Sequence, residues 1–271
     1  MIEKAQRSPM LAAIAAVVLT CDTGLARAQA VLSVTARAHA FATLPDWRGM
    51  WQSAAWLPLD VSGRPAGGEP QLLQTMQLVR HPPYNAEWNA RYEAQLENAA
   101  AVTAAAATFK ACARSFPALM EGPWIFQVAV LPEETLLVFE NGQVRHVYTD
   151  GRSHPTGDEL WPTPLGDSVG HWEGDTLVVD TVARTAGDLG PRATFAKLSD
   201  RARFIERIRR ADANTLEDRM TIEDPVAFAQ PWQLRFVFKR QPEMTRMIPT
   251  DCTENDRNPV IDGKMTITPV R

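Results

Sequence analysis

The second half of the chain alternates apolar and polar positions with a period of two, the pattern of half-buried β-strands. Three turn-forming tripeptides or dipeptides separate such runs: Asn141-Gly142, Glu173-Gly174-Asp175 and Asp212-Ala213-Asn214. Together these signals predict a series of hairpins. The predicted strands are 124–131, 135–140, 143–149, 169–172, 176–182, 202–210, 216–223 and 232–240, with a further edge strand in the final GKMTITPV.

The first half of the chain contributes one early strand and one helical segment. Residues 45–57 (PDWRGMWQSAAWL) are typical of a strand, and the Pro- and Gly-rich stretch 63–70 is typical of a loop. Residues 85–112 hold no Gly or Pro and are rich in Ala, Glu and Gln, so they predict a helix or a broken pair of helices. Asn85 is the expected N-cap.

Trp88, Tyr92 and Leu96 recur every fourth residue on that helix, which predicts a core-facing stripe. The strands follow one another without helical crossovers, which favours antiparallel pairing. We therefore expect a mainly β protein: an antiparallel meander barrel or sandwich, lipocalin-like, with an Ala-rich helical insertion.

The N-terminus has the pattern of a secretory signal. Lys4 and Arg7 precede the apolar run 10–19, and Ala28-Gln29-Ala30 is a small-x-small cleavage site. The pattern predicts a signal peptide over residues 1–30, a single mature β-rich domain over 31–271, and a periplasmic or secreted protein. An N-terminal anchor or buried helix, and a lipoprotein signal ending at Cys21, are the alternatives.

No later run approaches the roughly 20 apolar residues of a membrane span. We therefore expect no stable membrane insertion after signal cleavage. The mature chain keeps two cysteines, Cys112 and Cys252, and an oxidising compartment favours a disulfide between them. Two buried thiols are the alternative.

Composition and motifs limit the classes of partner and cofactor that we expect. The 271 residues are 45% hydrophobic and carry a formal net charge of −4, so the chain as a whole lacks the basic character expected of a nucleic-acid-binding protein. The sequence contains no phosphate-binding GxxxxGK[ST], no GxGxxG, no GxSxG and no HExxH. We expect no nucleic acid partner and no cofactor.

Residues 148–180 hold most of the polar groups that carry chemistry. The run YTDGRSHP places Tyr148, Asp150, Arg152 and His154 close together, and GDSVGHWEGD follows after a short loop. Each of these residues also has a structural interpretation, since Asp150-Gly151-Arg152 and Glu173-Gly174-Asp175 are typical turns and His154 precedes a proline.

The blocks YTDGRSHP, SVGHWEGDTLVVDT, ERIRRADANTLEDRMTIEDPVAFAQPW and CTENDRN, in this order, resemble a widespread family of exported bacterial proteins of unassigned function. The resemblance covers most of residues 120–258. This chain departs from the family at Asp167, where His is usual, and at His171, where Arg is frequent. It also has Cys112-Ala-Arg-Ser-Phe-Pro117 where the family has Cys-Pro-x-Gly-Met-Pro. The resemblance implies no activity, and if the family's usual His does chemistry, the change at position 167 implies a diverged function.

Acidic strand residues and a histidine inside a small barrel would suit cofactor-free acid–base catalysis, because burial raises a carboxyl pKa toward neutrality. His171 alternates with Trp172, so one of the two faces inward. Glu206 shares a strand face with Phe204 and Ile208, although an outward position is common for such a residue. The candidate catalytic residues are Asp150, Arg152, His154, Asp167, His171 and Glu206, and the candidate ligand-binding residues are Tyr148, Trp172, Glu173, Asp180 and Trp232.

A metal site formed by His154, Asp158 or Glu159, His171 and Glu173 is the weaker alternative, because no ligand spacing fixes it. The preferred function is a cofactor-free lyase, isomerase or cyclase acting on a small hydrophobic molecule in the barrel cavity. A lipocalin-like periplasmic carrier for a small apolar ligand, or an interaction module of the envelope, fits the same fold.

Overall fold

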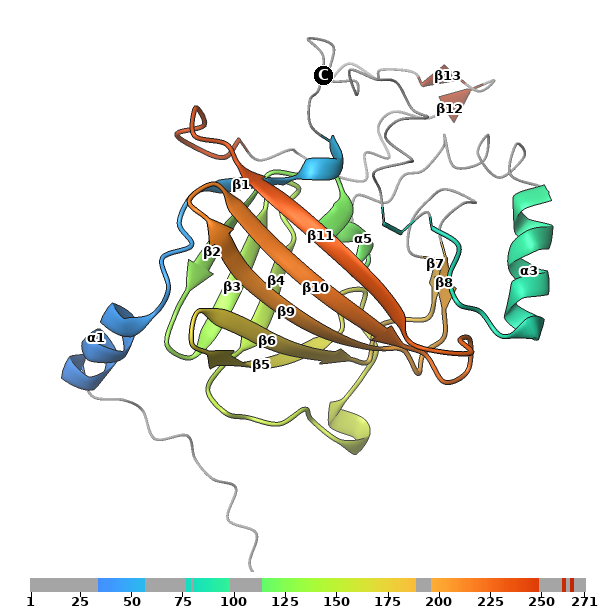
Figure 1. Cartoon of the computed structure of the whole chain (residues 1–271), viewed down its shortest axis with the longest axis horizontal. Helices are drawn as coiled ribbons and strands as arrows, with labels where there is room; N and C mark the ends of the chain where they lie inside the picture. The colour runs from blue at the N-terminus through green and yellow to red at the C-terminus, as the bar shows by residue number, and fades with distance from the viewer. Residues whose placement is uncertain are drawn as a thin grey trace, which may run out of the picture.

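Nine strands pair edge to edge and close on themselves into a barrel (Figure 1). The computed structural model describes residues 34–56, 77–78, 80–97, 114–188, 196–248, 260–261 and 264–265. The order around the barrel is β1-β11-β10-β9-β6-β5-β4-β3-β2. These strands are β1 (Met50–Ser53), β2 (Phe126–Val130), β3 (Glu134–Phe139), β4 (Val144–Tyr148), β5 (Asp167–Glu173), β6 (Thr176–Val182), β9 (Arg203–Asp212), β10 (Thr215–Glu223) and β11 (Trp232–Arg240).

The three predicted hairpins are confirmed. β3 pairs antiparallel with β4, β5 with β6, and β9 with β10. Gly142 and Gly174 adopt φ values of 82° and 64°, which a side chain would strain, so the glycines permit these two tight turns. Burial alternates along β3 and β6, as the period-two pattern predicts.

The predicted mainly β barrel is confirmed, but one seam departs from the expected antiparallel pairing. β4 and β5 run parallel and share a single pair of bridged residues, Tyr148 and Val169. The connection 149–166 returns the chain from the end of β4 to the end of the barrel where β4 began, so β5 runs in the same direction as β4. The short strand β1 closes the barrel by pairing with both β2 and β11.

Two small sheets lie outside the barrel order. β7 (Gly187–Asp188) pairs with β8 (Lys197–Leu198), and β12 (Val260–Ile261) pairs with β13 (Lys264–Met265). Within the segment GKMTITPV the structure describes Lys264–Met265, and these two residues form a strand in a sheet separate from the barrel.

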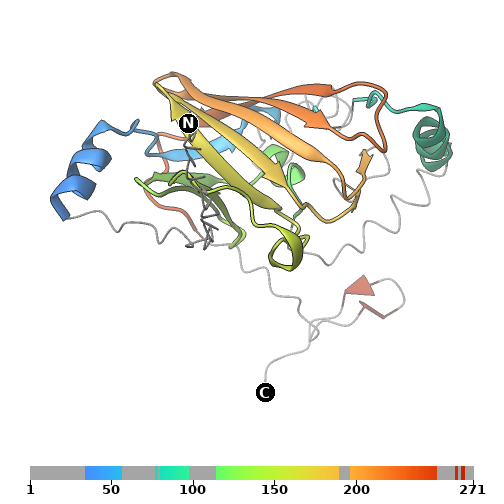
Figure 2. The ribbon, with the colours of Figure 1, turned by 90° about the horizontal axis from the view of Figure 1, so that it is seen from below.

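The helices are short. They are α1 (Val34–Thr43), η1 (Ala54–Trp56), α3 (Ala86–Glu97), α5 (Ala118–Glu121) and η2 (Gly157–Glu159). Helix α5 is buried along its whole length, whereas α1 and α3 lie at the periphery (Figure 1). Figures 1 and 2 show α1 and α3 at opposite sides of the barrel. No helix in the described ranges is long and apolar enough to cross a membrane.

α3 is the described part of the predicted Ala-rich insertion. The Asn85 side chain accepts a hydrogen bond from the Trp88 backbone N–H at 3.1 Å, which confirms the N-cap. Tyr92 is buried, and Trp88 and Leu96 pack against the core, as the stripe predicts. Residues 98–112 of the predicted helix lie outside the described residues, as do the signal segment 1–30 and the cysteines Cys112 and Cys252, so those predictions are untested.

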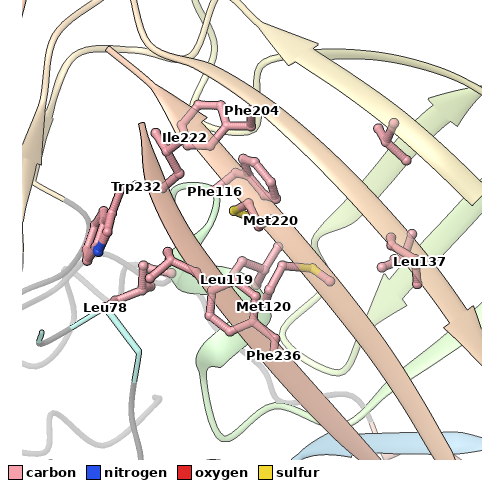
Figure 3. Packing of buried hydrophobic residues seen from close by; sticks show 14 of the residues in the cluster. Leu78, Phe116, Leu119, Met120, Leu137, Phe204, Met220, Ile222, Trp232 and Phe236 are labelled. Atoms are coloured by element: carbon pink, nitrogen blue, oxygen red, sulfur yellow. The ribbon is translucent and has the colours of Figure 1, made fainter. Parts of the chain in front are cut away.

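Large apolar side chains fill the barrel. Phe116, Leu119 and Met120, which precede β2, face Phe204 and the other apolar side chains of β9, β10 and β11 (Figure 3). Each fully buried side chain of this size contributes about 1.5–3 kcal/mol through removal of apolar surface from water. The interior is therefore a packed core, and polar side chains within it are exceptions that need partners.

Candidate functional site

A groove of about 400 Å³ lies along the parallel seam between β4 and β5. Only Tyr148 and Val169 bridge these strands, whereas every other neighbouring pair around the barrel shares at least two register positions. The poor pairing leaves room for the segment 163–166 beside β4. The lining residues are Gln143, Val144, Arg145, His146, Tyr148, Thr163, Pro164, Leu165, Gly166, Asp167 and Ser168.

Gly166 lets the chain enter β5 against β6. Its φ is 73°, and a Cβ atom there would lie 2.7 Å from the carbonyl oxygen of Val182. Thr163 also bridges to Arg184, which anchors the other end of this segment. The groove wall 163–166 is thus held close to the barrel by backbone contacts that only glycine permits at position 166.

One wall of the groove carries a histidine held by a carboxylate. His146 Nδ1 lies 2.9 Å from Glu134 Oε2, and the His146 side chain is 49% exposed. Glu134 pairs with Tyr148 in the β3–β4 register, which places it diagonally opposite His146. The His146 ring also stacks on Tyr148 at 6.1 Å between centroids. Glu134 thereby fixes the ring and directs Nε2 away from the carboxylate.

Asp167 lies on the opposite wall and is held by a second histidine. His154 Nδ1 is 2.5 Å from Asp167 Oδ1, and His154 Nε2 is 3.8 Å from Asp180 Oδ2. Arg203 pairs with Asp180 at 2.7 Å. His154 therefore lies between two carboxylates on the outside of β5 and β6, and it fixes the orientation of Asp167 in the groove.

Asp150 and Arg152 form an exposed pair at the end of β4. The Arg152 guanidinium bonds the Asp150 carboxylate at 2.6 Å and lies 4.0 Å from the centre of the Tyr148 ring. The hydrogen bond to Asp150 raises the pKa of Arg152 above its ordinary value. The pair covers the outer face of Tyr148 and so shapes the groove wall.

A second polar cluster is enclosed in the barrel. Arg145 makes an ion pair with Glu206 and donates to Thr181 Oγ1 at 3.0 Å. Both partners of the ion pair are essentially unexposed. The Arg145 guanidinium also lies 3.9 Å from the centre of the Phe116 ring. A buried ion pair survives only with such additional partners, because both charges lose their hydration.

Asp218 adds a third ionisable group to this interior cluster. Its side chain is fully buried, and neither carboxylate oxygen accepts a hydrogen bond from a donor in the described part of the chain. Burial, and then the neighbouring Glu206 charge, raise the pKa of Asp218 well above its ordinary value. Asp218 therefore lies beside the Arg145–Glu206 ion pair in an environment that favours its uncharged form.

The barrel core leaves no room for a substrate in the described residues. A hollow lined by inward side chains of β2, β3, β9, β10 and β11 measures about 10 Å³, less than a single water needs comfortably. The sequence-based expectation of a substrate inside the barrel cavity is therefore wrong for the described part, because Phe, Met and Leu side chains fill it.

The structure brings together Tyr148, Asp150, Arg152, His154, Asp167 and Asp180 at the seam. Glu206 faces inward, while Asp180, also on an apolar strand, faces outward to Arg203. The pairing of strand acids with a histidine inside the barrel was thus wrong: the second interior acid is Asp218, and the interior cation is Arg145.

The remaining candidates lie elsewhere. His171 is 65% exposed at the far end of β5, 3.3 Å from Glu173, which pairs with Arg207. The inward residue of that pair is Trp172, which packs edge-on against Trp47. Trp232 is a core residue beside Phe228. The predicted metal ligands are not assembled, since no three His, Cys, Asp or Glu side chains among the described residues form a metal site.

Sequence reasoning missed His146 and Glu134. Each looks like the polar position of an ordinary alternating strand, and the signal that joins them is the register of the Asn141-Gly142 hairpin. Reading that hairpin residue by residue would have placed Glu134 diagonally across from His146.

A second hollow of about 780 Å³ lies between α3 and β8. Its aromatic wall is formed by Tyr84, Trp88 and Tyr92, and Arg91 and Lys197 stand at its border. The volume falls within the range of small-molecule sites.

No protein-family model, curated protein or solved structure matches this chain. The resemblance to an exported bacterial family therefore stays a prediction. The function must be argued from the seam groove and from the hollow between α3 and β8, called the cleft below.

Proposed function

We propose that this protein is a cofactor-independent acid–base enzyme that acts on a small organic molecule bound in the seam groove. The observation that carries the proposal is the presence of two histidine–carboxylate pairs, Glu134–His146 and His154–Asp167, on opposite walls of one groove. Their inner members, His146 and Asp167, both line the groove.

His146 is the group that moves the proton. Because Glu134 Oε2 accepts a hydrogen bond from His146 Nδ1, the neutral imidazole carries its proton on Nδ1, and the lone pair lies on Nε2. A carboxylate behind the ring also stabilises the imidazolium that forms when Nε2 takes a proton. The same arrangement then returns the proton to the substrate.

Asp167 supplies a second, oppositely placed proton acceptor. His154 holds one of its oxygens, which limits rotation of the carboxylate. A substrate between the two walls has one group on each side, as isomerisation, elimination or cyclisation requires. Tyr148, Pro164 and Leu165 give the groove an apolar wall, which favours a substrate with a hydrophobic part.

Hydrogen isotope exchange tests the proposal without a known product. The full chain is incubated in heavy water with a panel of small carbonyl compounds that have acidic C–H groups, and loss of the C–H signal is followed by proton NMR. His146→Gln should slow exchange by about 10²–10⁴-fold. His171→Gln is the matched control, because the His171 ring also contacts a glutamate, through Nε2 at 3.3 Å, and lies outside the groove.

Unchanged exchange in His146→Gln, equal loss in both variants, or no exchange of any panel compound by the unaltered protein would contradict the proposal. Thermal melting of both variants separates a chemical effect from a loss of folding.

The cleft beside α3 favours a second candidate function, binding of a small apolar ligand. Its volume of about 780 Å³ and its wall of Tyr84, Trp88 and Tyr92 carry this candidate. Native mass spectrometry of the protein purified from its own host should then show a bound molecule that Trp88→Ala loses and His146→Gln keeps. The reverse pattern would assign the ligand to the groove.

A further inference from the structure

A row of three arginines crosses the outer face of β9, β10 and β11. Arg219 lies directly opposite Arg207 on one side and Arg235 on the other. Neighbouring strands are about 4.8 Å apart, so the row spans about 10 Å. Like charges directly opposite one another destabilise a sheet, so folding alone does not favour this row.

The neighbouring positions of the same face add more positive charge. We define the arginine face as the outward side chains Arg207, Arg209, Glu217, Arg219, Arg235 and Lys239. Its five cations meet three carboxylates: Glu217, Glu173 from β5, and Asp212, whose charge interacts with Lys239. The difference is a formal charge of +2 on a chain whose net charge is −4.

Glu217 shows how this face binds an anion. Its Oε1 accepts hydrogen bonds from Arg219 Nε at 2.6 Å and Arg235 Nε at 3.0 Å, and Oε2 accepts from Arg209 at 3.2 Å. Those guanidiniums cover Glu217, which is only 4% exposed, while Arg219 itself is 65% exposed. Each guanidinium has five N–H donors, so one carboxylate shared among three arginines leaves donors directed to solvent.

We propose that the arginine face is a docking surface for an acidic protein, whose carboxylates pair with Arg207, Arg219 and Arg235. The anion already bound there is a carboxylate, and arginine is enriched at protein interfaces. The uncharged outward residues described on these strands include Ile205, Thr221, Gln233 and Val237, and no aromatic side chain stands among them. The choice of an acidic protein rests on Glu217, because a carboxylate is the anion that this face already binds through three guanidiniums.

Fluorescence anisotropy with labelled poly-L-glutamate tests this surface on the full chain. Binding should weaken as salt is added, and Arg219→Gln/Arg235→Gln should raise the Kd at least about tenfold. The control Arg201→Gln/Arg246→Gln removes the same charge from two exposed arginines outside the face and should change the Kd less than about twofold.

Some outcomes overturn the proposal. They are absence of binding by the unaltered protein, equal losses in the two double variants, and face-dependent binding of phosphatidylglycerol vesicles or polyphosphate without binding of poly-L-glutamate. If the double variant fails to fold, the single variant Arg235→Gln keeps Arg209 and Arg219 on Glu217 and must still weaken binding more than Arg246→Gln does.

Discussion

Replacing Asp218 with Asn should make the protein more stable, and increasingly so as the pH rises. The amide has nearly the shape of the carboxyl group and is neutral at every pH. In the native protein the Asp218 carboxyl is fully buried, and burial together with the neighbouring Glu206 charge raises its pKa well above the ordinary value. The variant therefore removes an ionisable group from the core while leaving the packing intact.

The size of the effect follows from the protons bound by each state. In the unfolded chain the carboxyl ionises near its ordinary pKa of 3.8, whereas in the folded protein it keeps its proton to a higher pH. Between these two values unfolding releases one proton, so the free energy of unfolding falls by about 1.4 kcal/mol per pH unit. The Asp218→Asn variant lacks this loss. The stability difference should be small below the unfolded pKa and should grow until the folded carboxyl ionises.

Urea unfolding of both proteins between about pH 4.5 and about pH 7 measures the slope. The control Asp200→Asn changes an exposed carboxylate and should shift stability by less than about 0.5 kcal/mol at each pH. A stability difference for Asp218→Asn that stays constant with pH would refute the reasoning, because it would mean that Asp218 binds the same number of protons in both states.

Two further predictions concern the arginine face and the groove. Glu217→Gln should cost about 1–2 kcal/mol at neutral pH, since exposed guanidiniums are partly screened. Hydrogen bonds from Arg235 and Arg219 lower the pKa of Glu217 to about 2. Its contribution to the free energy of unfolding is therefore complete above pH 4.5 and is lost as the pH falls toward 2. Urea unfolding that gives the same loss of stability for Glu217→Gln at acidic and neutral pH would contradict this. Gly166→Ala should lower the free energy of unfolding by more than about 1 kcal/mol, because the new Cβ would lie 2.7 Å from Val182 O at a φ of 73°. Gly142→Ala is the control and should cost less, because Gly142 has a similar φ of 82° but open space around the position of a Cβ. Equal losses in the two glycine variants, measured by thermal unfolding, would show that backbone strain and not the close contact decides the cost.

The candidate site was only partly predictable from the sequence. The block 148–154 drew attention to the seam, because it gathers polar residues beside a proline and a glycine turn. Asp167 was a candidate because it lies in the same polar region, 148–180. Arg145 and Asp218 gave no such signal, since a charged residue in an alternating strand looks the same whether it faces the core or the solvent. His146 was missed because its partner Glu134 lies on the neighbouring strand.

The sequence by itself determined the local structure: the strands from their period-two pattern, the hairpins from Asn141-Gly142 and Gly174, and the helix from Asn85 onward. Only the tertiary structure decided that β4 and β5 run parallel, that β1 closes the barrel, and that Glu206 faces inward while Asp180 faces outward. The physical reason is the distance along the chain over which each interaction acts. Turn geometry and side-chain alternation act between neighbouring residues, whereas register, closure and burial depend on which distant strands pair.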